Sequence, residues 1–191
     1  VMVMRLTSDS GKGTLSRIIS LESLHADKTI TADGNAITLT GYPTPVSGDR
    51  RVGDAWKNGL KYAQQLLVRH DGGKISVIDG KKLKIENAKE IIVLMSAATN
   101  YVQCMDDSYN YFSKEDPLNK VKTTLKKVAQ KKYTALLATH KKDYHSLYDR
   151  MQLNLGSLPE TPAVTTDSLL KGMDDNTNSE QENQYLEMLY F

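Results

Sequence analysis

Residues 62–96 decide the fold of this chain, and they read YAQQLLVRHDGGKISVIDGKKLKIENAKEIIVLMS. Tyr62, Gln64, Leu66 and Val68 form a mostly apolar face at period two, which predicts a strand. Asp71 to Gly73 and Asp79-Gly80 are typical of the tight turns that join antiparallel strands. The stretch therefore predicts a meander of four strands, the last of them, over residues 90–96, a buried-looking strand.

Further strand signals lie upstream of this stretch. Residues 29–31 and 37–39 flank Asp33-Gly34, which predicts another hairpin, and the opening residues 1–4 are also strand-like. Residues 42–57, rich in proline and glycine, predict a longer loop. The fold class predicted from these signals is mainly β with added α, in which residues 1–114 form part of an antiparallel β-sandwich domain.

The period of the apolar pattern changes after residue 115. Asp116-Pro117 predicts a helix start, with a side-chain acceptor at the N-cap and proline at the first helical position. Apolar and aromatic side chains then recur every three or four positions from Leu118 to Met151. One long helix or a helix pair with a break near Lys131-Lys132 fits this spacing equally well.

The end of the chain mixes several signals. Residues 151–156 predict a short strand, residues 157–180 a loop, and residues 181–191 the start of another helix. The chain opens on a strand-like Val1 and closes at Phe191 in the middle of an apolar pattern. We expect it to be an internal piece of a longer protein.

Composition excludes several classes of protein. The chain has 191 residues, 39% of them hydrophobic, and a formal net charge of only +2. The near-neutral charge and the lack of interleaved aromatic residues argue against a nucleic-acid partner for the lysines of residues 120–132, which predict a solvated helix face. The longest apolar run, residues 91–98, is too short for a membrane helix. The single cysteine, Cys104, excludes an internal disulfide and a zinc site built from several thiolates.

The sequence predicts no metal site. His140 and His145 are five residues apart, which places them on different faces of a helix. The acidic and amide residues from Asp174 to Asn178 begin like a calcium loop, but Ser179 and Tyr185 stand where the loop needs glycine and glutamate.

Four segments together resemble one family of enzymes. Residues 96–101 read Ser-Ala-Ala-Thr-Asn-Tyr, and residues 140–156 run from His-Lys-Lys-Asp-Tyr to Asn-Leu-Gly. Residues 165–170 and 186–191 follow in the family's order and spacing. The chain is identified by these segments as similar to glycoside hydrolase family 95.

The resemblance implies a fold and an activity. Members of the family are mainly α-L-fucosidases, with an N-terminal β-sandwich of the galactose-mutarotase-like, super-sandwich type, a helical linker and an (α/α)6 barrel. This chain would be the later part of the sandwich, the linker over residues 115–180, and over residues 181–191 the first helix leading to the barrel. The family hydrolyses terminal fucose with inversion, and its acid and base lie in the barrel, so no residue of this chain is predicted to be catalytic and no cofactor is expected.

The resemblance also implies partners and a location. The partners would be the barrel of the same polypeptide and fucosylated glycans, with no nucleic acid and no membrane. Since the family acts on extracellular or periplasmic glycans, a secreted or periplasmic protein is expected. A linker separated from its barrel would expose apolar surface, which predicts self-association of the chain.

Two interpretations stay open for the residues that stand out. Asn100 and Tyr101 would contact the barrel, or they would pack the joint between sandwich and linker. His140 and Tyr144 are also candidates for contact with the barrel, or His140 would be a packed or hydrogen-bonded residue of the linker. Trp56 would stack on a sugar ring, or it would anchor its own loop. If Trp56 binds sugar, the alternative function is a stand-alone carbohydrate-binding β-sandwich module.

Overall fold

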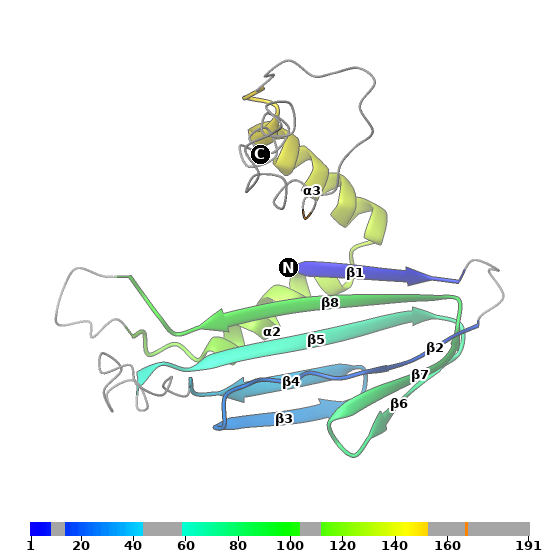
Figure 1. Cartoon of the computed structure of the whole chain (residues 1–191), viewed down its shortest axis with the longest axis horizontal. Coiled ribbons are helices and arrows are strands. Elements are labelled where there is room, and N and C mark those ends of the chain that lie inside the picture. Colours follow the sequence, from blue (N-terminus) through cyan, green and yellow to red (C-terminus); the bar gives the residue numbers. More distant parts are fainter. Residues whose placement is uncertain (9–13, 44–58, 104–111, 153–166, 168–191) are drawn as a thin grey trace. The chain divides into compact units, whose positions relative to one another are not determined.

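The computed structural model describes residues 1–8, 14–43, 59–103, 112–152 and 167 (Figure 1). Its strands are β1 (Met2–Thr7), β2 (Leu15–Ile19), β3 (Lys28–Asp33), β4 (Ala36–Gly41), β5 (Tyr62–Asp71), β6 (Lys74–Ile78), β7 (Lys82–Ala88) and β8 (Glu90–Thr99). Its longer helices are α2 (Pro117–Ala129) and α3 (Tyr133–Tyr148). The chain forms two compact units, residues 1–133 and residues 134–191.

The strands form two antiparallel sheets, which confirms the predicted sandwich with helices. The larger sheet has the order β1-β8-β5-β4-β3, and the smaller one has the order β2-β7-β6. The core between the sheets combines Ile37, Leu66, Val68, Ile91 and Val93 of the larger sheet with Leu83, Ile85 and Ala88 of the smaller one. The apolar positions at period two are therefore the residues that the two sheets bury against each other.

The predicted turns fall where the sequence places them. Asp33 pairs with Ala36 across the first hairpin, and Gly34 takes a φ of 54°. Asp79 and Gly80 join β6 to β7 with φ values of 51° and 63°. Both backbone conformations are left-handed, which glycine and, less readily, aspartate adopt.

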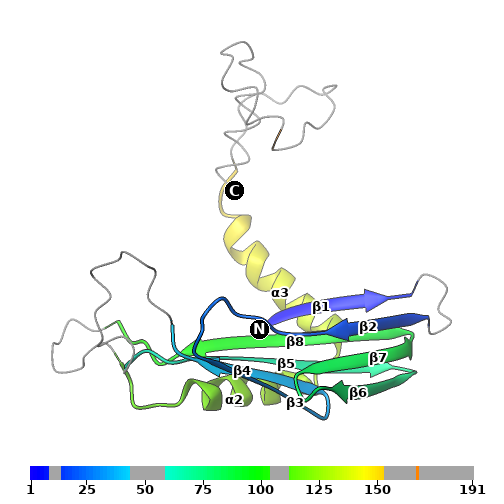
Figure 2. The same cartoon turned by 60° about the horizontal axis from the view of Figure 1, so that its bottom comes forward.

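Strand β8 is buried on both of its faces. Ile91 and Val93 lie in the core between the sheets, whereas Ile92 and Leu94 point to the opposite face, where α2 packs on β8 and β5 (Figures 1 and 2). This burial explains the continuous apolar run from Ile91 to Leu94, since a strand covered on both faces has no polar side. The first unit thus has three layers, with α2 on the outer face of the larger sheet.

The helical region is a pair of helices. Asp116 is the N-cap of α2, where its side chain accepts a hydrogen bond at 3.0 Å from the backbone N–H of Leu118, and Pro117 follows as predicted. The helix ends at Ala129, and α3 begins at Tyr133. The break at Lys131-Lys132 is therefore present, and the helical pattern corresponds to two helices.

The two helices differ in burial. Val121 and Leu125 of α2 are buried, whereas α3 has no buried residue. Because α2 packs on the sheet, the first compact unit extends to residue 133, beyond the predicted end of the sandwich at 114. The predicted strand, loop and helix after residue 152 lie outside the described residues. No helix within the described ranges is long and apolar enough to span a membrane.

Candidate functional site

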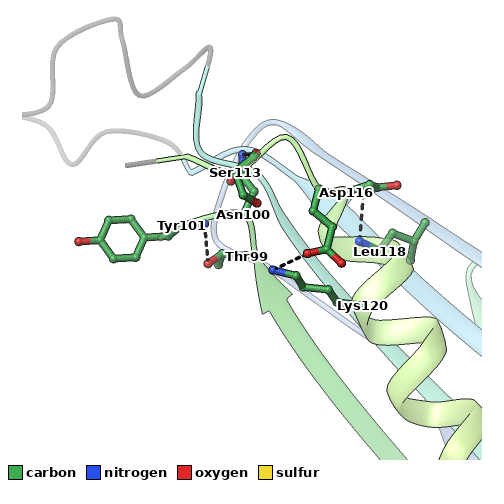
Figure 3. Close-up of polar contacts among 8 residues, drawn as sticks. Thr99, Asn100, Tyr101, Ser113, Asp116, Leu118 and Lys120 are labelled. Atoms are coloured by element: carbon green, nitrogen blue, oxygen red, sulfur yellow. Dashed lines mark hydrogen bonds and ion pairs between the residues drawn. The ribbon is translucent and has the colours of Figure 1, made fainter. Parts of the chain in front are cut away.

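Asn100 is a buried polar residue at the end of β8, only 5% exposed. Its side-chain oxygen accepts a hydrogen bond at 2.7 Å from the backbone N–H of Lys61, and its side-chain nitrogen donates at 2.7 Å to the carbonyl of Gly59. Its own backbone carbonyl accepts from the N–H of Ser113 at 2.8 Å. One residue thus joins three segments: the entry to β5, the exit from β8 and the approach to α2. Figure 3 shows Asn100 beside Ser113 at the end of β8.

Tyr101, the next residue, has a different environment. Its backbone forms an isolated antiparallel bridge with Phe112, and its N–H donates to the Thr99 hydroxyl at 3.3 Å. Its ring points away from the end of the strand, and the residue is 46% exposed (Figure 3). The ring of Phe112 lies against Gly59, where a β-carbon would overlap it. Both Asn100 and Tyr101 therefore take part in the joint between sandwich and helix, and contact with a barrel stays a prediction.

His140 and Tyr144 lie on α3 in the second unit, and both are exposed. Their ring centroids are 6.3 Å apart, and Tyr144 stacks on Tyr148 at 5.0 Å. The neighbouring His145 lies 3.2 Å from Asp149 through its Nδ1 atom. His140, Tyr144 and Tyr148 thus form an exposed aromatic row on α3. Contact of this row with a barrel stays a prediction.

The predicted sugar-binding residue, Trp56, lies outside the described residues, so its two interpretations both stay predictions. Within the part of the chain that the structure describes, no three metal-ligating side chains gather at one point.

Glu86 is a carboxylate with a shifted pKa. Hydrogen bonding to Lys84, at 2.8 Å, and pairing with Lys74, at 3.4 Å, lower the pKa of the Glu86 carboxyl. A glycosidase acid must keep its proton near neutral pH, which requires a raised pKa. Glu86 is therefore a half-buried ion-pair residue, and its pKa is shifted in the wrong direction for a general acid.

Two arginines that no sequence pattern marked converge on the α2–α3 elbow, residues 129–133. Arg69 of β5 donates hydrogen bonds to the carbonyls of Ala129 and Lys131, and the guanidinium of Arg5 lies 5.0 Å from the centroid of the Tyr133 ring. An arginine in a strand carries no local signal of a partner 60 residues away. Only the packing of α2 on the sheet reveals the contact.

Comparison with known families divides the chain in two. Residues 1–104 match the model of "Glycosyl hydrolase family 65, N-terminal domain". Residues 132–191 match the model of "Glycosyl hydrolase family 95 catalytic domain". The second match begins within the α2–α3 elbow.

Two curated proteins are similar to almost the whole chain. One is "Alpha-L-fucosidase 2" of Arabidopsis thaliana, 27% identical over 95% of this chain and 22% of its own length. The other is "Probable alpha-fucosidase A" of Aspergillus niger, 26% identical over 100% of this chain and 23% of its own length. The chain thus spans less than a quarter of the relatives that it matches.

Proposed function

Because the chain belongs to the glycosyl hydrolase family 65 N-terminal domain family through residues 1–104, and continues into a family 95 catalytic-domain match, we propose that it is the non-catalytic sandwich and linker of an inverting α-L-fucosidase. The substrate would be terminal fucose of glycans. The observation that carries the proposal is the succession of these two matches in one chain, in the order implied by the resemblance to family 95.

The geometry of the first unit, residues 1–133, favours an architectural role. Inverting hydrolysis needs an acid and a base about 6.5–9.5 Å apart, with room for water between them. At the end of β8, the side-chain amide of Asn100 instead forms hydrogen bonds with the backbone of Gly59 and Lys61. The first unit would therefore act as a rigid base for the catalytic domain, and that domain would supply both the acid and the base.

The direct test compares two proteins, this 191-residue chain and the longer glycosidase to which it belongs. Both are incubated with an α-1,2-linked fucoside, and the anomeric form of the released fucose is followed by NMR. We expect the longer protein to release β-fucose first and the chain to release none. Turnover by the chain alone, or retained α-configuration from the longer protein, would contradict the proposal.

The alternative function, a stand-alone carbohydrate-binding module, can be tested with the same 191-residue chain. Calorimetric titration of the chain with a fucosylated oligosaccharide should give no binding heat if its role is architectural. Saturable heat that disappears in Trp56→Ala would instead establish a sugar-binding module.

A secreted or periplasmic location is part of the proposal, because the expected substrates are extracellular glycans. Fractionation of the source cells with an antibody against the chain tests it. Recovery of the protein in the cytoplasmic fraction alone would contradict it.

A further inference from the structure

Arg5, Ile92 and Arg69 form one row across three neighbouring strands. Ile92 of β8 is in register with Arg5 of β1 on one side and with Arg69 of β5 on the other. Residues in register across antiparallel strands share a face of the sheet. Since Ile91 and Val93 point into the core between the sheets, this row lies on the opposite face, which carries α2.

Arg69 holds the end of α2 through two backbone carbonyls. Its Nη1 atom donates at 2.7 Å to the carbonyl of Ala129 and at 2.8 Å to that of Lys131. The last carbonyls of a helix have no partner within the helix and carry its negative dipole end. A guanidinium is suited to this position because it supplies both positive charge and several N–H donors.

Arg5 contacts Tyr133, the last residue of the elbow. Its guanidinium lies 5.0 Å from the centroid of the Tyr133 ring, within the range of a cation–π contact. The Arg5 Nε atom also donates to the carboxylate of Glu90, which lies in the next register row of the same face. That ion pair orients the Arg5 guanidinium, and the negative charge of Glu90 reduces the repulsion between Arg5 and Arg69.

These contacts meet where the catalytic-domain match begins. The groups that the two arginines hold belong to residues 129–133, and the family 95 match starts at residue 132. The four residues from Gln130 to Tyr133 include two exposed lysines and no buried side chain, so little apolar burial holds this segment in place.

We propose that Arg69 and Arg5 are a two-arginine clamp by which the sandwich anchors the root of the catalytic domain. This inference rests on the proposed function for the identity of the anchored domain. The clamp itself is a property of the first unit, because every residue in it lies within residues 1–133. Arg69 and Arg5 are positioning residues.

The test measures opening of the elbow in the 191-residue chain. Endoproteinase Lys-C cleaves after lysine, and mass spectrometry of the fragments scores the cuts at Lys131 and Lys132 separately from the new site that Arg69→Lys creates at residue 69. The variants are Arg69→Met and Arg5→Met, with Arg69→Lys as the conservative change. Arg17→Met is the matched control, since Arg17 is a strand arginine, exposed like Arg5, that donates to the carbonyl of its neighbour Ser16.

We expect Arg69→Met to speed cleavage at the elbow about tenfold, because two charge-assisted hydrogen bonds are lost and cleavage follows the open population. Arg5→Met should give a smaller increase, and Arg69→Lys should restore part of the protection. Amide hydrogen exchange should rise over residues 129–133 and stay unchanged in the paired strands β6 and β7. The control should match the parent chain.

Two results would overturn the clamp. One is unchanged cleavage and exchange at the elbow in Arg69→Met. The other is an equal rise in exchange throughout the first unit, which would show a general loss of stability. Neither depends on whether the longer protein hydrolyses fucosides, so failure of the clamp and failure of the proposed function are distinguishable.

Discussion

The carbonyl oxygen of Glu86 lies so close to Gly73 that a β-carbon on this glycine would overlap it. Gly73 also has a φ of 66°, a left-handed conformation that other residues adopt at a cost. The turn at Gly72-Gly73 carries the chain from β5 in the larger sheet to β6 in the smaller one. The close approach is thus what lets one tight turn connect the two layers.

Gly73→Ala should therefore destabilise the sandwich strongly. We expect a loss of about 3 kcal/mol or more in the free energy of unfolding, from backbone overlap added to left-handed strain. Gly34→Ala is the matched control, because Gly34 has a φ of 54° but open space around its α-carbon. It should cost only about 1–2 kcal/mol. Urea unfolding followed by circular dichroism measures both, and equal losses would show that the overlap is relieved.

Removing the Asn100 amide should loosen the joint between the sandwich and α2. Asn100→Ala leaves the N–H of Lys61 and the carbonyl of Gly59 without the buried amide that bonds them. We expect a loss of about 2–4 kcal/mol in the free energy of unfolding. The measurement is the urea midpoint of the chain and of its variants.

A neighbouring serine supplies the control for this prediction. The Ser113 hydroxyl is buried and makes no hydrogen bond within the described part of the chain. Ser113→Ala should thus be neutral or slightly stabilising, because a buried polar group without a partner costs free energy. If both variants lose the same stability, side-chain volume at the joint matters and the amide bonds do not.

Acid should weaken the pairing of β6 with β7 in the smaller sheet through Glu86. The folded-state pKa of this carboxyl is lowered, chiefly by its hydrogen bond to Lys84, so folding favours the ionised form. Its contribution to stability is complete above the unfolded-state pKa of about 4.3 and disappears as the pH falls through the lowered value. Glu86→Gln should therefore show a smaller drop in melting temperature between about pH 5 and pH 3 than the parent chain.

High salt tests the cause of this effect. The lysines of both ion pairs are solvent-exposed, so roughly 1 M sodium chloride should screen the pairs and reduce the difference between the two proteins. A difference that survives high salt would point to a cause other than charge pairing.

Helix α3 should drive self-association of the chain. Tyr144 is 48% exposed and Leu147 is 60% exposed, on a helix without a buried residue. Light scattering over a concentration series should show a rising mass, and Leu147→Lys should reduce it because charge disfavours apolar contact. Lys142→Glu, also on the exposed surface of α3, is the control and should leave the mass unchanged. A constant monomer mass in the parent chain would contradict the prediction.

Much of the first unit follows from local patterns in the sequence. Asp33-Gly34 and Asp79-Gly80 mark turns because few residues accept a positive φ, and Asp116-Pro117 marks a helix start because each residue suits its own capping position. These signals involve neighbouring residues, so they can be seen without a structure.

Other features depend on packing between distant segments. The pattern of 118–151 could not separate one helix from two, because apolar spacing continues across the break at Lys131-Lys132. The apolar spacing continues in α3, yet no residue of α3 is buried among the described residues. An apolar stripe shows which side of a helix is suited to burial, but it does not show whether a partner covers that side. Arg5 and Arg69 gain their significance only from the row that they form with Ile92.

The pairing of β1 with β8 also governs how the protein can be made. Met2–Thr7 finds its partner in Glu90–Thr99, so β1 leaves the ribosome well before β8 and must wait for it. At about 5–20 residues per second, this interval lasts roughly 4–20 seconds for the nascent chain. During it Leu6, which packs against the core of the folded unit, stays uncovered, and a chaperone bound to the nascent chain would shield it.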